Sequence, residues 1–143
     1  MTTVTIQVTL DQARAIAFAL DTYCRLCIGQ LEVVTALVND GTIPIGWREP
    51  AKDRLGADYD TCKSIDAHMR ECKNLLGYWP DGSNGIGHPH VDITGKRAWE
   101  IKKALEKAMA VHRDPNPAFP TVAYDGRVVR YTSDPDATVE VTP

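Results

Sequence analysis

The chain has 143 residues, of which 43% are hydrophobic and 24% charged, as is ordinary for a folded globular protein, and we expect one domain, 1–143. No apolar run approaches the roughly 20 residues of a membrane-spanning helix, and the first ten residues lack a secretory signal, so we expect a cytoplasmic protein without a membrane partner. The net charge of −3 argues against a nucleic acid polymer as partner.

Alternating apolar residues at 3–9 predict a short, half-buried N-terminal strand. Thr9 and Gln12 have the spacing of a capping box, which opens a helix that we expect to run to Asn39 and stop at Gly41. A second helix is expected over 51–76, with Gly77 as its stop, and a third over about 94–112.

The residues after the third helix predict β-structure. The segment TVAYDGRVVRY at 121–131 has the pattern of a hairpin with a type I′ Asp-Gly turn, and 137–141 is a candidate for another strand. A flexible C-terminal tail is expected over 133–143. The expected fold class is therefore α+β: three helices packed with a small, mostly antiparallel sheet formed by the N-terminal strand and the C-terminal hairpin.

The first predicted helix has two apolar faces, which is typical of a helix that packs against its own domain and against a partner subunit. We therefore expect self-association through this helix. One face consists of Leu10, Ala13, Ala17, Leu20, Cys27, Leu31, Val34 and Val38, and the other of Ile16, Ala19, Tyr23, Leu26, Val33 and Leu37.

Arg25 is the only charged residue between Asp21 and Glu32 on this helix, and Gly29 follows one turn later. One interpretation is an arginine at a helix edge whose stem covers apolar surface, with Gly29 allowing close helix contact. The other is a guanidinium held in a partly desolvated site, where it meets an anion.

The segment YWPDGSNGIGHPHV at 78–91 contains two adjacent aromatic residues and several glycines between two predicted helices. It has neither a Walker nor a dinucleotide-binding glycine pattern. It is either a structured connection with Trp79 in the core, or a ligand loop in which an aromatic ring stacks on a base.

Cysteine and histidine residues offer a second kind of candidate site. Cys24 and Cys27 have C-x-x-C spacing, but inside a helical pattern, and Cys62 and Cys72 would lie about 15 Å apart along a helix. We expect reduced, structural thiols and no metal; a zinc site would require convergence with His88 or His90. His88 and His90 are candidate bases, but no catalytic motif accompanies them, so surface or capping roles are favoured and no catalytic residue or cofactor is assigned.

Near the C-terminus, Arg127 and Arg130 are expected to point to opposite faces of an extended strand. One of the two guanidinium groups would then be solvated while the other reaches a pocket.

Three short segments together resemble a known family: RLCIGQ at 25–30, NGIG at 84–87 and YDGRVVR at 124–130. The layout of 3–131 is similar to the first-described Thoeris anti-defence sponges encoded by phages. The resemblance implies a protein in the cytoplasm of an infected bacterium that sequesters cyclic ADP-ribose isomers without cleaving them. It also implies dimers that assemble into hexamers, and in some members separate sites for cyclic oligonucleotides.

The resemblance also implies ligand contacts. Arg25 and either Arg127 or Arg130 would bind the phosphates, Trp79 or Tyr78 would stack on the base, and Asn84 would bind a polar edge. The other motif residues counted as ligand-binding candidates are Gln30, Ile86 and Tyr124.

Two other classes of function are compatible with the sequence. One is a phosphodiesterase-like enzyme that uses His88 and His90 to degrade such a signal. The other is a protein that binds a host protein through its first helix.

Overall fold

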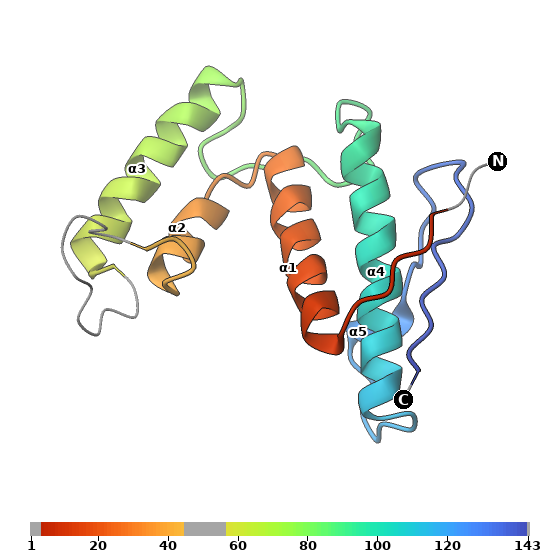
Figure 1. Cartoon of the computed structure of the whole chain (residues 1–143). Helices are drawn as coiled ribbons and strands as arrows, with labels where there is room; N and C mark the ends of the chain where they lie inside the picture. The colour runs from red at the N-terminus through yellow and green to blue at the C-terminus, as the bar shows by residue number, and fades with distance from the viewer. Residues whose placement is uncertain (1–3, 45–56, 143) are drawn as a thin grey trace. The chain divides into compact units, whose positions relative to one another are not determined.

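The computed structural model describes residues 4–44 and 57–142, which form five helices and contain no β-strand. The α+β class with its antiparallel sheet is therefore wrong for the described part of the chain. The helices, shown in Figure 1, are α1 (Leu10–Cys27), α2 (Val33–Asn39), α3 (Tyr59–Leu75), α4 (Ile93–Arg113) and α5 (Val122–Asp125).

The contacts gather in two compact units. Unit 1 consists of Met1–Cys24 with Ile86–Pro143, and unit 2 of Arg25–Gly85, so the last turn of α1 belongs to unit 2. The expectation of a single domain stays a prediction.

In unit 1, α1 packs antiparallel to α4. The side chain of Asp21 binds Lys102, and the hydroxyl of Tyr23 lies 2.7 Å from that of Thr94. The core consists of Ala13, Ala17 and Leu105, with Leu20, Met109 and Val139 packed against it.

In unit 2, α2 packs antiparallel to α3. The thiol of Cys62 lies 3.8 Å from Oδ1 of Asn39 at one end, and Lys73 binds Glu32 at the other. Helix α3 begins at Tyr59 because Asp58 caps it, accepting a hydrogen bond of 2.8 Å from the backbone N–H of Thr61. The expected start of this helix at 51 lies outside the described residues.

The first helix ends at Cys27 and not at Asn39. Gly29 has φ +84°, its N–H bonds to the carbonyl of Leu26, and the N–H of Gln30 bonds to the carbonyl of Arg25. These two bonds and the left-handed glycine make a Schellman motif, which stops a helix. The apolar pattern that predicted one long helix continues past this stop because residues Val33–Asn39 form a second helix, α2.

The expected N-terminal strand is not present in the described part. Val4, Ile6 and Val8 are exposed, and no neighbouring segment pairs with them. An alternating pattern indicates a strand only if another strand supplies backbone partners, and none is available among the described residues.

The expected C-terminal hairpin is also wrong. Residues Val122–Asp125 form α5, in which the N–H of Tyr124 bonds to the carbonyl of Thr121. Gly126 has φ +65° and ψ −142°, which a type I′ turn does not allow at that position. The proposed strand at 137–141 instead contributes Val139 to the core of unit 1.

Several local predictions are confirmed. Thr9 and Gln12 exchange the two hydrogen bonds of a capping box, the described helices end before Gly41 and Gly77, and α4 spans nearly the expected residues. Among the described residues, no helix is long and apolar enough to cross a membrane.

Candidate ligand-binding site

Unit 2 contains an open pocket of about 390 Å³. It is formed by the last turn of α1, the beginning of α2, the end of α3 and the turn at 81–83. The residues that line it are Arg25, Gln30, Glu32, Val33, Ala36, Lys73, Asp81, Gly82 and Ser83.

The Schellman motif at the end of α1 places Arg25 and Gln30 at this pocket. The guanidinium Nη1 of Arg25 donates to Oε1 of Gln30 at 3.2 Å, and Nε2 of Gln30 donates to Oγ of Ser83 at 3.4 Å. The backbone N–H of Gln30 also donates to the carbonyl of Arg25, at 2.9 Å. Gln30 therefore orients the guanidinium through both its backbone and its side chain, and connects it to the loop after α3.

Lys73 is the most deeply buried charged residue of the pocket, with 1% of its side chain exposed. Its ammonium group lies 2.5 Å from Oε1 of Glu32, which is partly exposed. Burial alone would raise the pKa of Glu32, but the hydrogen bond and the positive charge of Lys73 outweigh burial and hold this pKa below its ordinary value. Lys73 and Glu32 therefore form an ion pair that joins α3 to the segment just before α2.

A second ion pair lies at the same pocket. Nη2 of Arg70 is 3.0 Å from Oδ1 of Asp81, and both side chains are more than half exposed. The pocket is thus lined by two cations, Arg25 and Lys73, and by two carboxylates, Glu32 and Asp81.

Tyr78 and Asn84 pack on the Schellman motif. A Cβ atom built on Gly29 would lie 2.5 Å from the ring of Tyr78, and the N–H of Asn84 donates to the carbonyl of Ile28 at 2.8 Å. The amide Nδ2 of Asn84 lies 3.5 Å from the hydroxyl of Tyr78. These two candidates therefore support the backbone that carries Arg25 and Gln30, and neither lines the pocket.

Trp79 is 84% exposed and does not fill a core position, so the structured-connection interpretation of this residue is wrong. Its carbonyl accepts a hydrogen bond of 2.9 Å from the N–H of Gly82 in a tight turn. The indole thus lies at the surface of the turn that supplies Gly82 and Ser83 to the pocket.

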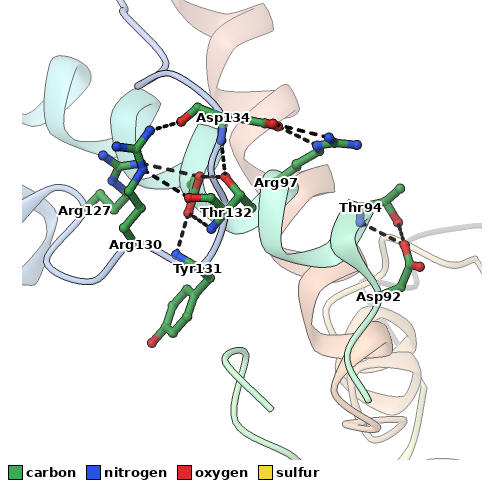
Figure 2. Close-up of polar contacts among 9 residues, drawn as sticks. Asp92, Thr94, Arg97, Arg127, Arg130, Tyr131, Thr132 and Asp134 are labelled. Carbon is green, nitrogen blue, oxygen red and sulfur yellow. Dashed lines mark hydrogen bonds and ion pairs between the residues drawn. The ribbon is translucent and has the colours of Figure 1, made fainter. Parts of the chain in front are cut away.

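The later candidates belong to unit 1. Nη1 of Arg127 lies 3.4 Å from Oε2 of Glu100, and its other terminal nitrogen binds Asp136. Arg130 donates to the carbonyls of Thr132, at 3.1 Å, and Asp134. Figure 2 shows both arginine side chains turned toward the same C-terminal cluster, and they do not alternate across a strand.

Glu100, which is buried on α4, lies at the centre of this cluster, whose other members are Arg127, Arg130, Tyr131, Thr132 and Asp134. Its carboxylate accepts from the N–H groups of Tyr131 and Thr132, at 2.8 and 3.0 Å, and from the hydroxyl of Thr132 at 2.7 Å. Burial acts to raise the pKa of Glu100, but these donors and the charge of Arg127 hold it below its ordinary value.

The cluster also includes Asp134, near the start of the segment 133–143. The carboxylate of Asp134 binds the guanidinium of Arg97 on α4, as Figure 2 shows. The backbone N–H of Asp134 in turn donates to the hydroxyl of Thr132 at 3.2 Å. The flexible tail over 133–143 stays a prediction.

The remaining candidates in unit 1 have local roles. The hydroxyl of Tyr124 donates to the carbonyl of Asp114 at 3.0 Å, and Ile86 is half-buried. His88 and His90 are exposed, with their rings edge to face, and His88 accepts from the backbone N–H of His90. As ligand contacts, Ile86, Tyr124, Arg127 and Arg130 stay predictions.

The four cysteines carry free thiols, of which Cys24 is buried and Cys72 exposed. The thiol of Cys24 donates to the carbonyl of Gly95 at 3.6 Å within unit 1. A structural role therefore fits Cys24, whereas the exposed Cys72 has no packing role of that kind. Within the described ranges, no group of three or more metal-ligating side chains converges.

Sequence reasoning missed four polar residues that line the pocket: Glu32, Lys73, Asp81 and Ser83. On α3 the structure buries Lys73 and exposes its neighbour Cys72. Two sequence signals could have found three of them: Glu32 lies two residues after the RLCIGQ segment, and Asp81 and Ser83 lie within the glycine-rich segment 78–91. Comparison of the chain with known protein families, with characterised proteins and with solved structures finds no match.

Proposed function

We propose that this protein binds a cyclic nucleotide signal, a cyclic ADP-ribose isomer, and sequesters it without cleaving it. The observation that carries the proposal is the convergence of Arg25, Gln30 and Ser83 on one pocket of about 390 Å³. This volume lies within the roughly 300–1,000 Å³ of small-molecule sites, and a guanidinium is the side chain best suited to phosphate recognition.

The roles of the side chains follow from their positions. Arg25 binds a phosphate oxygen, while the amide of Gln30 and the hydroxyl of Ser83 supply neutral hydrogen bonds. Trp79 offers an exposed indole face on which a purine can stack. Tyr78 and Asn84 act as positioning residues, because they hold the backbone of the Schellman motif.

The resemblance of segments 25–30, 84–87 and 124–130 to Thoeris anti-defence sponges supports the cyclic ligand and the non-enzymatic role. It also supports a setting in the cytoplasm of an infected bacterium. Self-association through α1 belongs to the same proposal, because Ile16, Tyr23 and Leu26 leave apolar surface exposed on one face of that helix.

The experiment incubates the purified protein with a cyclic ADP-ribose isomer, removes unbound ligand by dialysis, and denatures the protein by heat. Mass spectrometry then measures what is released. We expect the intact cyclic nucleotide in near-stoichiometric amount. Release of a hydrolysed product would contradict sequestration and favour the phosphodiesterase-like alternative. Absence of any bound nucleotide would contradict the proposal.

A further inference from the structure

The charged groups at the pocket of unit 2 already have partners within the protein. The ammonium of Lys73 lies 2.5 Å from Glu32, and Asp81 is neutralised by Arg70 at 3.0 Å. Arg25 also has partners in the folded chain. A phosphate that enters the pocket must therefore use donors that remain open or exchange with one of these partners.

The ammonium group of Lys73 has donors to spare. A lysine carries three N–H donors, and among the residues that the structure describes the ammonium of Lys73 has one partner, Oε1 of Glu32. Only 1% of the side chain is exposed, so bulk water has almost no access to the other two donors. Lys73 nevertheless lines the pocket. A buried ammonium with open donors is costly, and an anion with several acceptor oxygens would remove that cost.

Glu32 is the partner that is able to leave. Its side chain is 39% exposed, whereas Lys73 is buried on α3. Glu32 is the N-cap residue of α2, but its side chain makes no capping hydrogen bond, so the helix does not depend on the position of this carboxylate. A carboxylate that turns to solvent regains its hydration, but it would leave Lys73 as an uncompensated buried charge. Another anion must therefore replace Glu32 as it leaves.

We propose that Lys73 is a second phosphate-binding residue of this pocket, and that Glu32 occupies its ammonium group until a phosphate of the ligand replaces the carboxylate. The inference rests on the proposed function and assigns to its site a residue of α3 that the family resemblance does not supply. A diphosphate presents more acceptor oxygens than a single carboxylate, so the exchange gives the open donors of Lys73 additional partners. Arg25 then binds one phosphate of the ligand and Lys73 the other.

Two substitutions test the exchange, because they should change the affinity in opposite directions. Glu32→Gln removes the competing negative charge at nearly constant shape, and should bind a cyclic ADP-ribose isomer at least about threefold more tightly than wild type. Lys73→Met removes the ammonium group and should bind the same ligand at least about tenfold more weakly. Calorimetry measures both affinities. If the ion pair only held α3 against α2, Glu32→Gln would weaken binding, and this result overturns the inference.

Glu71→Gln is the matched control, because it removes an exposed carboxylate of α3 that does not line the pocket. It should bind the cyclic nucleotide as wild type does. An equal gain of affinity in Glu71→Gln and Glu32→Gln would show a general effect of net charge, and would overturn the exchange at Lys73.

Thermal unfolding with inorganic pyrophosphate gives a second readout that does not depend on the nucleotide. Without ligand, Glu32→Gln should melt below wild type, because Lys73 loses its charged partner. Pyrophosphate should then raise the melting temperature of Glu32→Gln by more than that of wild type. Equal shifts in the two proteins overturn the inference.

Failure of the inference and failure of the proposed function give different results. Wild-type affinity for the cyclic nucleotide in both Glu32→Gln and Lys73→Met overturns the inference and leaves the proposed function in place. Folded wild-type protein that binds no cyclic ADP-ribose isomer overturns the proposed function, and the inference with it.

Discussion

The ring of Tyr78 packs directly on the backbone of Gly29, so closely that a Cβ atom at position 29 would lie 2.5 Å from ring carbon Cε1. Gly29 also has φ +84°, in the left-handed region that favours glycine. The last turn of α1, which carries Arg25, is therefore fixed by a residue that lies beyond α3.

Gly29→Ala should lower the free energy of unfolding by about 2–4 kcal/mol, because the left-handed backbone costs about 1 kcal/mol and the clash with the ring costs about 1–3 more. Gly77→Ala is the control, since Gly77 has φ +80° but nothing within 4 Å of its Cβ position. Denaturant unfolding of both variants checks this prediction. An equal loss of unfolding free energy in the two variants would contradict the prediction, because it would mean that the Tyr78 ring moves aside without an energetic penalty.

Thr35 on α2 is buried, and its hydroxyl has no hydrogen-bond partner within the part of the chain that the structure describes. Thr35→Val removes this hydroxyl at nearly constant shape, so we expect the free energy of unfolding to stay unchanged or to rise by up to about 1 kcal/mol. The melting temperature should then stay unchanged or rise as well. Thr132→Val should do the opposite, because the hydroxyl of Thr132 donates to Glu100 at 2.7 Å. Thermal unfolding distinguishes the two, and a clear destabilisation by Thr35→Val would mean that this hydroxyl is bonded.

Glu100 should make stability depend on pH. Its pKa is lower in the folded protein, so its contribution is present above the ordinary value of about 4.3 and is lost as the pH falls through the lower, folded pKa. Glu100→Gln should cost about 2 kcal/mol at pH 7 and flatten the melting-temperature profile below about pH 4.3.

The control for Glu100 is Glu140→Gln, which removes an exposed carboxylate of unit 1. Melting temperatures of the three proteins between pH 7 and pH 3 should show the wild-type slope in this control. A wild-type slope in Glu100→Gln as well would contradict the role of Glu100.

Self-association should depend on the exposed face of α1. Ile16→Glu places a charge among apolar side chains and should shift the protein to a smaller species in light scattering at micromolar concentration. Val128→Glu adds the same charge at another exposed apolar position of unit 1 and should leave the assembly unchanged. A wild-type protein that is already monomeric would contradict this part of the proposal.

The sequence predicted those parts of the fold that local chemistry determines. The capping box at Thr9 and the glycine stops at Gly41 and Gly77 lie where the pattern placed them. The apolar alternation at Val4–Val8 and the Asp-Gly pair at 125–126 failed, because both require a partner strand. Strand pairing is a tertiary property that single-sequence patterns do not contain.

The candidate site was predicted in part. Arg25 and Gln30, two of the ligand-binding candidates, line the same pocket, and their contact with a ligand stays a prediction. Gly29 ends the helix and does not serve a contact between helices. Lys73 was not predictable, because a buried lysine at the end of an amphipathic helix looks like a solvated one until Glu32 is brought to it. Its partner comes from 41 residues earlier in the chain.

The most direct test of the account is calorimetric titration of a cyclic ADP-ribose isomer into wild type, Arg25→Ala and Arg14→Ala. Arg14 is the matched control, since it is an exposed arginine of unit 1 that pairs with Asp11. Loss of a charge-assisted phosphate contact costs about 2 kcal/mol or more, so Arg25→Ala should weaken binding at least about 30-fold. Arg14→Ala should bind as wild type does. Equal affinity in all three proteins would contradict the assignment of the pocket, and absence of binding by wild type would contradict the proposed function.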